Sequence, residues 1–423
     1  VRMMQFSCGW TGPIVAGLIC LVSGGTAGAG PMQSWEQGGG DAGRSGYAGG
    51  SINATQIELA WTAPLGFVQS GTGSWDNRAV ATDGRYVYRT ALEGYAPSGD
   101  YHVMAFDLHT GSEAWRTTLK GRAFEGVSEP VVANGKVWVQ RAGHSGLSGS
   151  TDADRPALYG LSAVDGSVVS STFFEAQWGE SERPAVDNGL LVGMAGYYGG
   201  VAGYDTATGE QRWWHYGPQL ENPRPLLTEN HYITYDSVLR NRDDGSLVGD
   251  LATGARPNLE LTTVSPNGQV LGRSNAAAQG THVVAYDDQN FEETWATDVG
   301  AYINAVYAGD DVVLAITNVG VTLLDATSGE LQWQVERPGP LRTQEGAVSD
   351  THFFVTGTDT TYAINLIDGS VDWVIDDAGE LALGDGYLFL SDRASIRAYS
   401  VVPEPATLTG LSLAGLLVLR RRR

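Results

Sequence analysis

A segment of eleven residues recurs along this chain, and few folds accommodate such a repeat. The full pattern is an apolar stretch that ends at Asp or Asn, a Gly four residues later and a Trp four residues after the Gly. Copies spaced about 40 residues apart indicate one supersecondary unit per copy. Three copies keep the whole pattern, two are looser and two lack the Trp: Ala105–Trp115, Gly203–Trp213 and Leu323–Trp333; Ala285–Trp295 and Ala363–Trp373; Leu161–Ser170 and Arg240–Gly249.

The residue types within the repeat predict a tight turn between two strands. An Asp side chain caps backbone N–H groups two residues further on, and Gly adopts a positive φ without a Cβ clash. The Trp recurs at one position, and we expect it to pack between neighbouring units, because buried aromatic residues dominate cores. Structural roles are therefore assigned to Asp107, Gly111, Trp115, Asp205, Gly209, Trp213, Asp325, Gly329, Trp333, Trp61, Trp295 and Trp373.

A second turn precedes each copy, and an apolar strand such as Val137–Val139 follows it. Each unit therefore contains four short strands joined by tight turns, which is the signature of a β-propeller blade. The eight turns are Asp83-Gly84, Asn134-Gly135, Asn188-Gly189, Glu229-Asn230, Asn267-Gly268, Asp310-Asp311, Asp350-Thr351 and Asp385-Gly386.

The two ends of the repeat region predict the number of blades. The last unit, from Leu381 to Ser400, has only three strands, and Ile57–Trp61 looks like the missing fourth. If this N-terminal strand completes the last blade, eight four-stranded blades form a ring that protects its sheet edges. We expect an all-β, eight-bladed propeller over residues 56–401. Seven blades is the alternative, if the unit at Arg240–Gly249 is not a blade.

The Asp-x-x-Thr-Gly-x-x-x-Trp run resembles the PQQ-like, or quinoprotein-type, propeller repeat over roughly residues 57–400. This resemblance implies the propeller fold, but a fold alone does not decide function. The family includes dehydrogenases that use pyrroloquinoline quinone (PQQ) and calcium, and also a lipoprotein scaffold of the outer-membrane barrel-assembly machinery that binds no quinone. The dehydrogenases have an adjacent-cysteine disulfide over the quinone, whereas the cysteines here, Cys8 and Cys20, both precede the repeat.

The first 29 residues have the features of a secretory signal peptide. Arg2 precedes the apolar run Pro13–Val22, and Ala27-Gly28-Ala29 has the small residues of a cleavage site. Cleavage after Ala29 would remove both cysteines and leave no thiol nucleophile, thiolate metal site or disulfide. Residues 30–55 are rich in Gly and Ser, which is typical of a flexible leader.

Residues 402–423 contain Pro403-Glu404-Pro405, an apolar stretch at 406–419 and the cluster Arg420–Arg423. This order resembles the PEP-CTERM sorting signal. The resemblance implies recognition by an exosortase-type membrane enzyme, transient membrane contact through 406–419, and a Gram-negative-type bacterium, of a group that often makes exopolysaccharide. The alternative is a plain membrane helix, but residues 406–419 span only about 21 Å of a ~30 Å hydrocarbon core.

Composition and spacing exclude several functions. A net charge of −22 repels phosphate backbones, so nucleic acid is not an expected partner. The histidines show no metal-ligand spacing, and Asp310-Asp311, Asp376-Asp377 and Asp152–Asp154 lack the spacing of a calcium loop. Neither a Gly-x-Ser-x-Gly elbow nor a phosphate loop occurs. We therefore assign no catalytic, cofactor-binding or metal-binding residue.

Two departures from the repeat predict a binding surface. Arg89–Asp100 and Ala142–Pro156 are insertions between the second and third strands of the first two blades, so both emerge on one face. Long loops on a rigid scaffold commonly carry binding sites, although a tolerated surface insertion is the plainer alternative. Gly196–Gly200 occupies the corresponding turn of the third blade and adds aromatic residues to the same rim.

We expect an exported, non-catalytic propeller scaffold that binds a protein or polysaccharide at the bacterial cell envelope, in the periplasm, the outer envelope or the extracellular matrix. The first alternative is an oxidoreductase with PQQ and calcium in the propeller funnel, and the second is a polysaccharide hydrolase or lyase with carboxylates there. Both alternatives require non-repeat polar residues that converge at the axis, whereas a scaffold requires only ordinary repeat positions.

Overall fold

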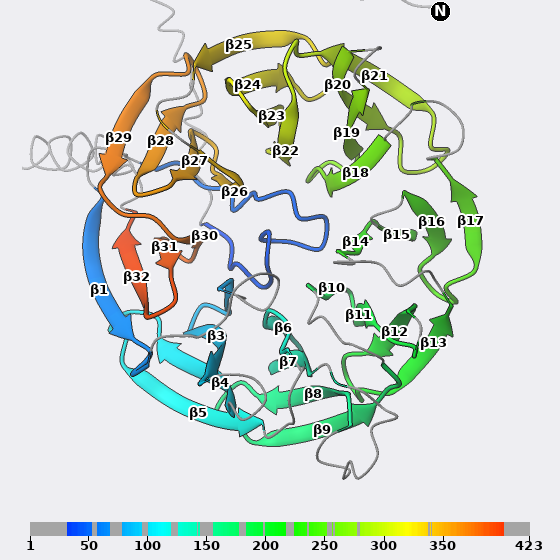
Figure 1. Cartoon of the computed structure of the whole chain (residues 1–423), viewed down its shortest axis with the longest axis vertical. Coiled ribbons are helices and arrows are strands. Elements are labelled where there is room, and N and C mark those ends of the chain that lie inside the picture. Colours follow the sequence, from blue (N-terminus) through cyan, green and yellow to red (C-terminus); the bar gives the residue numbers. More distant parts are fainter. Residues whose placement is uncertain are drawn as a thin grey trace, which may run out of the picture.

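Eight four-stranded antiparallel sheets surround a common axis in this computed structural model, like the blades of a propeller (Figure 1). The structure describes residues 32–401, apart from 53–56, 68–77, 95–99, 120–125, 142, 144–154, 177–182, 198, 217–223, 235–236, 252–255, 257–258, 277–279, 337–338 and 340. The predicted signal peptide, with Ala27 and Ala29, and the predicted sorting signal, with Pro403, Glu404 and Pro405, lie outside these residues. Within them, no helix is long and apolar enough to cross a membrane.

The first four blades follow one another along the chain, and each runs from the axis to the rim. Blade 1 contains β2 (Val80–Thr82), β3 (Tyr86–Glu93), β4 (Asp100–Asp107) and β5 (Glu113–Leu119). Blade 2 contains β6 (Val131–Ala133), β7 (Lys136–Arg141), β8 (Ala157–Ser162) and β9 (Val168–Phe173). Blade 3 contains β10 (Ala185–Asp187), β11 (Leu190–Met194), β12 (Val201–Asp205) and β13 (Gln211–His215). Blade 4 contains β14 (Leu226–Leu227), β15 (His231–Ile233), β16 (Val238–Asn241) and β17 (Leu247–Asp250).

The remaining blades complete the ring. Blade 5 contains β18 (Leu259–Val264), β19 (Val270–Ala276), β20 (Gly280–Tyr286) and β21 (Glu293–Asp298). Blade 6 contains β22 (Ile303–Ala308), β23 (Val312–Thr317), β24 (Gly320–Asp325) and β25 (Leu331–Glu336). Blade 7 contains β26 (Leu341–Val348), β27 (His352–Gly357), β28 (Thr361–Asn365) and β29 (Val371–Ile375). Blade 8 contains β30 (Glu380–Gly384), β31 (Tyr387–Ser391), β32 (Ser395–Ser400) and the N-terminal strand β1 (Glu58–Pro64).

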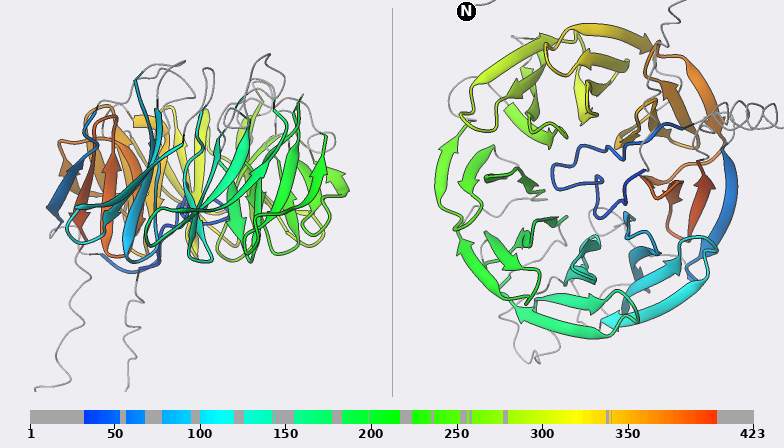
Figure 2. Two further views of the ribbon diagram at one scale, coloured as in Figure 1. Left: turned by 90° about the horizontal axis from the view of Figure 1, so that it is seen from below. Right: turned by 180° about the vertical axis from the view of Figure 1, so that it is seen from behind.

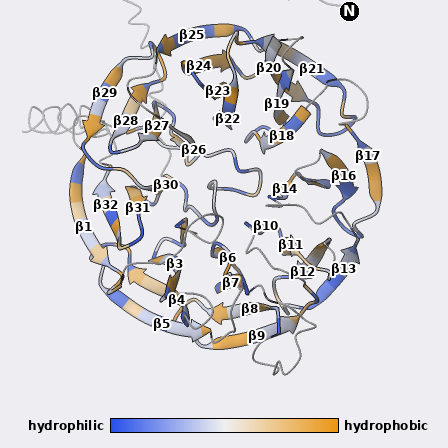
Figure 3. Ribbon diagram, in the orientation of Figure 1, coloured by the Kyte–Doolittle hydropathy of each residue, from blue (hydrophilic) through white to orange (hydrophobic). Residues whose placement is uncertain are grey.

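The predicted blade number and ring closure are confirmed. β1 pairs antiparallel with β32, from Glu58 opposite Ser400 to Pro64 opposite Ser395, so the chain's two ends share one sheet. The seven-blade alternative is wrong, because β14–β17 form a complete four-stranded sheet. The outermost strands mix hydrophilic and hydrophobic residues along their length (Figure 3), as expected for strands with one face in water.

The repeat Asp caps the turn between the third and fourth strands of a blade. In blade 1, Oδ1 of Asp107 accepts the backbone N–H groups of His109 at 3.1 Å and Thr110 at 2.9 Å. Gly111 follows with a φ of +67°, which residues with a Cβ rarely adopt. In blade 5 the equivalent residue is Phe291, with a φ of +56°, so this turn keeps its shape without the glycine.

The repeat Trp is present in six of the eight blades and joins each of them to the next blade. Nε1 of Trp115 donates to the carbonyl oxygen of Ala163 in the following blade at 3.1 Å. The indole lies over the turn glycine of that blade, and a Cβ on Gly166 would come within 2.4 Å of the ring. The same donor bond connects Trp61 to Leu108, Trp213 to Arg242, Trp295 to Ala326 and Trp333 to Leu366, while Trp373 packs edge-on against Tyr399.

Residues 32–52, here called the axial segment, cross the centre of the ring (Figure 1, dark blue), so the expectation of a flexible leader is wrong for them. Seen edge-on, they lie toward one side of the disc (Figure 2). Backbone carbonyls of the segment accept N–H groups at the ends of the inner strands at 2.6–3.1 Å. In order, Gln33, Trp35, Glu36, Ala42, Gly43, Ser45 and Gly46 bond to blades 8, 1, 2, 4, 5, 6 and 7.

Blade 3 is held by a side chain instead. The amide of Gln37 both donates to the carbonyl of Val186 and accepts its N–H, each at 2.9 Å. The axial segment therefore contacts all eight blades in their order around the ring. Its bonds satisfy backbone groups that the innermost edge of each sheet would otherwise leave without a partner.

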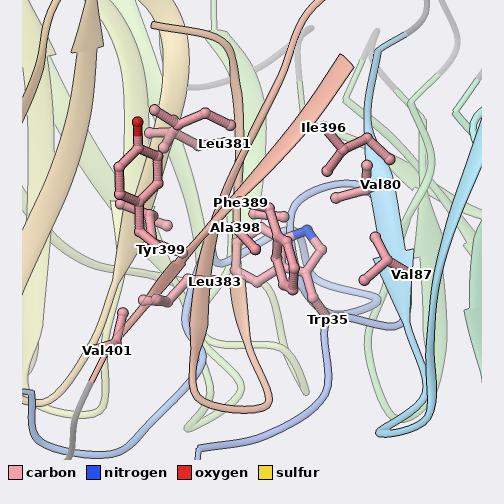
Figure 4. Close-up of a cluster of buried hydrophobic side chains, with 14 of the residues drawn as sticks. Trp35, Val80, Val87, Leu381, Leu383, Phe389, Ile396, Ala398, Tyr399 and Val401 are labelled. Carbon is pink, nitrogen blue, oxygen red and sulfur yellow. The ribbon is translucent and has the colours of Figure 1, made fainter. Parts of the chain in front are cut away.

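Trp35 anchors the axial segment in the core. Its side chain is only 2% exposed and packs where blade 8 meets blade 1, beside Val80, Val87 and Phe389 (Figure 4). The glycines of the segment permit close contact with the blades: a Cβ on Gly43 would lie 2.6 Å from the carbonyl oxygen of Val264. The Gly-rich composition thus reflects tight packing at the axis.

Candidate functional site

Charged residues from several blades converge at the axis. Glu129, Arg183, Arg224 and Glu380 belong to blades 2, 3, 4 and 8, and each lies five residues before the inner turn of its blade. Arg44 reaches them from the axial segment. Because four blades supply the same repeat position, the axis carries a charged set that the scaffold hypothesis does not predict.

These side chains bond mainly to one another and to the chain's own backbone. Arg183 forms ion pairs with the carboxylates of Glu129 and Glu380, the latter at 2.9 Å. Arg44 donates to the carbonyl oxygens of Gly38 at 2.8 Å and of Arg183. Burial lowers the pKa of Arg44 to about 9 and raises the pKa of Glu129. The neighbouring Arg183 guanidinium, followed by burial, lowers the pKa of Arg224 to about 10. The network thus fastens the axial segment to the blades.

The residues at the axis do not fit PQQ with calcium. This quinone is a multiply charged acid and would need guanidinium groups to pair with. At the axis, the guanidinium groups of Arg183 and Arg44 are already bonded to Glu129, Glu380 and backbone carbonyls. In the part of the chain that the structure describes, no three His, Cys, Asp or Glu side chains are placed to hold a metal ion. Glu129 and Glu380 share the guanidinium of Arg183, so both carboxylates are engaged in ion pairs.

A pocket of about 410 Å³ lies between blades 2 and 3, at the strand ends opposite the axial segment. Its walls are largely aromatic: Phe173 ends β9, Trp214 lies on β13, Tyr216 follows β13, and Tyr197 comes from the turn after β11. Phe173 and Trp214 are 42% and 43% exposed, and Tyr216 is 64% exposed, so the rings are accessible from solvent. The volume is in the range of small-molecule sites, roughly 300–1,000 Å³.

Polar side chains complete the pocket lining. Arg155, Glu175 and Gln211 supply a guanidinium, a carboxylate and an amide. The Arg155 guanidinium lies 4.6 Å from the centre of the Phe173 ring, a cation–π distance. The described lining residues include one cation and one anion, so they carry no net charge, in contrast to the protein's total of −22.

The pocket is supported by buried backbone contacts between the two blades. The N–H of Gly196 donates to the carbonyl of Glu175 at 2.6 Å, and the buried amide of Gln140 both donates to and accepts from the backbone of Met194 at 2.9 and 3.0 Å. Trp214 is fixed by a 3.0 Å bond from its Nε1 to the carbonyl of Ala195. These contacts join the two blades and hold the Trp214 ring in place before any ligand binds.

Two glycines allow the Trp214 indole to lie against the turn. A Cβ on Gly196 would come within 3.0 Å of Trp214 Nε1, and one on Gly200 within 2.9 Å. Both residues also have positive φ angles, +113° and +142°. The Gly-Tyr-Tyr-Gly-Gly turn is therefore built around this tryptophan.

The structure brings together part of the predicted binding rim. Arg155, from the end of the insertion Ala142–Pro156, and Tyr197 line the same pocket, while residues 95–99, 142, 144–154 and 198 lie outside the described part. The predicted insertion Arg89–Asp100 is shorter than expected, because residues 89–93 continue β3 and Asp100 begins β4, and none of its described residues lines this pocket. Trp214 and Tyr216 were not predicted from the sequence. The signal for Trp214 was an aromatic residue directly after the repeat Trp213, because other complete copies have Arg116 or Gln334 there.

The conspicuous histidines and acids of the sequence have structural partners. His102 is buried, and its ring nitrogens lie 3.0 Å from the Glu93 carboxylate and 3.1 Å from the Thr118 hydroxyl. The Asp310 carboxylate accepts a 3.0 Å hydrogen bond from the Tyr47 hydroxyl of the axial segment.

Comparison with known proteins agrees with this architecture. The family described as outer membrane protein assembly factor BamB matches residues 48–213 and 235–380, which include most of the propeller. The chain belongs to this family. The resemblance to the PQQ-like repeat is thereby confirmed. Among curated proteins, no significant match to the chain was found.

Several solved structures share the fold of this BamB-family propeller. BamB from Moraxella catarrhalis is 13% identical, with a TM-score of 0.56, 81% of this chain and 97% of that chain being covered. The computationally designed protein Ika8 is 14% identical, with a TM-score of 0.58 and coverage of 79% and 99%. A europium-containing methanol dehydrogenase is 13% identical, with a TM-score of 0.58 and coverage of 85% and 89%. At these identities the likeness concerns the fold alone.

Proposed function

We propose that this protein is an exported, non-catalytic scaffold that binds a polysaccharide or protein at the bacterial cell envelope. The observation that carries the proposal is the aromatic pocket between blades 2 and 3, which is open to solvent and held by contacts between blades. Large apolar side chains rarely remain exposed together in a pocket unless they serve binding.

The remainder of the molecule favours a scaffold over a catalyst. The axial segment bonds to all eight blades, and the charged side chains at the axis pair with one another. The family description names an outer-membrane assembly factor, which makes an envelope partner the natural expectation. The sequence identities to the solved structures are too low to identify the partner, so the partner is inferred from the chemistry of the pocket.

The ends of the chain supply the envelope location in this proposal. A signal peptide cut after Ala29 would export the protein, and Pro403-Glu404-Pro405 with its apolar stretch and arginines would present it to an exosortase-type enzyme. Deletion of residues 403–423 should shift the protein between the membrane, periplasmic and extracellular fractions, as followed by immunoblotting. An unchanged distribution would contradict the sorting assignment.

The non-catalytic assignment is tested by titration with PQQ and Ca²⁺, followed by tryptophan fluorescence and by the quinone absorption band. We expect no saturable binding, because the axial arginines already have partners. Stoichiometric binding would overturn the assignment and make the protein an oxidoreductase candidate. The stated alternative would then take precedence, with an alcohol or sugar as the substrate to be sought.

A further inference from the structure

We infer that the pocket between blades 2 and 3 binds a hexopyranose unit of an uncharged polysaccharide. The inference rests on the proposed binding function and selects one ligand class for that site. It depends on three features of the pocket: the exposed aromatic rings, the polar groups beside them and the absence of net charge.

The aromatic rings provide stacking surfaces. Phe173 belongs to blade 2, whereas Trp214 and Tyr216 belong to blade 3, so rings enter the pocket from both sides. Aromatic faces are electron-rich, and the C–H groups on one face of a pyranose ring carry slight positive charge. A sugar ring therefore packs on such a face and keeps its hydroxyl groups at the edges.

The polar groups match those hydroxyl groups. The Glu175 carboxylate accepts hydrogen bonds, the Arg155 guanidinium donates them, and the Gln211 amide does both. Neighbouring hydroxyls on a sugar need this mixture of donors and acceptors.

Charge selects a neutral sugar over an acidic one. The Arg155 guanidinium already lies over the Phe173 ring, and Glu175 adds a negative charge to the same pocket. The whole protein carries −22, which repels a polyanionic chain as it approaches. A polyuronate would meet this repulsion along its whole length.

The rigidity of the site reduces the entropy lost on binding. Trp214 is held by its bond to Ala195, and the Gly196 and Gly200 backbones lie directly against its indole. Groups that are already fixed do not lose freedom when the ligand arrives, so affinity improves.

The test is affinity electrophoresis of the full exported protein in gels that contain a soluble neutral β-glucan or a galactomannan, with polygalacturonate as the charged probe. Isothermal titration with the bound polysaccharide gives the affinities. The variants Trp214→Ala and Tyr216→Ala each remove one ring from the pocket. Tyr302→Ala is the matched control, because Tyr302 is 51% exposed and does not line the pocket.

We expect a neutral polysaccharide to retard the wild-type protein and the Tyr302→Ala variant, and polygalacturonate to retard neither. Each pocket variant should lose about tenfold or more in affinity, the usual effect of removing one stacking ring. Circular dichroism and thermal melting verify that the variants are folded.

Three results would overturn the inference: no retardation by either neutral polysaccharide, preferential binding of polygalacturonate, or equal losses in Tyr302→Ala and Trp214→Ala. A protein adduct from a photo-crosslinking residue at position 216 would favour a protein ligand and overturn it as well. In each of these cases, a wild-type protein that still fractionates with the envelope would leave the proposed function intact. Failure to reach the envelope would instead refute the proposed function.

Discussion

Replacing Trp35 tests whether the axial segment is part of the folded ring. The Trp35 side chain is 2% exposed and packs at the seam between blades 8 and 1. Truncating a buried Trp to Ala typically costs 3–5 kcal/mol, from lost burial and from the cavity that remains. At an unfolding entropy near 2.1 cal/mol/K per residue, the roughly 300 described residues give about 0.6 kcal/mol/K. We therefore expect Trp35→Ala to lower Tm by about 6 °C in differential scanning calorimetry.

The matched control is Trp214→Ala, which removes the same side chain from a half-exposed position. It loses one hydrogen bond and roughly half the burial of a Trp side chain, so its cost should be about half that of Trp35→Ala and its Tm should lie between those of Trp35→Ala and the wild type. Limited trypsin digestion supplies an independent reading, because the Arg44 side chain is buried in the axial segment. Cleavage after Arg44 should be slow in the wild type and faster in Trp35→Ala. If the wild type and Trp35→Ala had equal Tm values and were cleaved equally rapidly after Arg44, the packed arrangement of the axial segment would be refuted and the flexible leader restored.

Two further predictions concern the turns. Gly135 and Gly329 have nearly the same φ, +68° and +70°, but only at Gly329 would a Cβ meet a ring, 2.5 Å from Trp295. Gly135→Ala should therefore lower the free energy of unfolding by about 1 kcal/mol. Gly329→Ala should lower it several times more, as measured by urea denaturation. The pKa of Asp205 is lowered from 3.8 to about 2, and the largest cause is the hydrogen bond that its carboxylate accepts from Arg212. A carboxylate whose pKa is lower in the folded state stabilises the protein above its unfolded pKa, and this contribution is lost as pH falls through the folded value. Asp205→Asn should thus be destabilising at pH 6, with a difference from wild type that shrinks between pH 4 and pH 2; a difference independent of pH would contradict this account.

The propeller could be predicted from the sequence because its determinants are local and repeated. The Asp cap, the positive-φ Gly and the Trp lie within eleven residues of one another, so each copy encodes its own turn. The blade number required only one non-local step, the pairing of Ile57–Trp61 with the three-stranded last unit.

The axial segment could not be predicted in this way because its structure is set by the rest of the ring. It has no alternating apolar pattern, and Gly and Ser dominate its composition, as they do in flexible linkers. Its backbone carbonyls bond to residues up to about 350 positions away in the sequence, such as Ala308, Val348 and Asp385. The charged axial set was missed for a related reason. Glu129 and Arg183 share a repeat position, but only the ring brings their side chains together.

The axial segment and the pocket between blades 2 and 3 lie at opposite ends of the strands, so we expect them to act independently. The axial segment bonds to the ends of the inner strands, whereas the pocket lies where β11 and β13 finish on the other face. No described residue is shared between the Trp35 core cluster and the pocket lining. Substitutions at separated sites without common partners usually add within about 0.5 kcal/mol. The double variant Trp35→Ala/Trp214→Ala should therefore show the sum of the two stability losses, with glycan affinity reduced only as far as in Trp214→Ala alone. A larger loss of affinity in the double variant would mean that the axial segment controls the shape of the pocket across the blades.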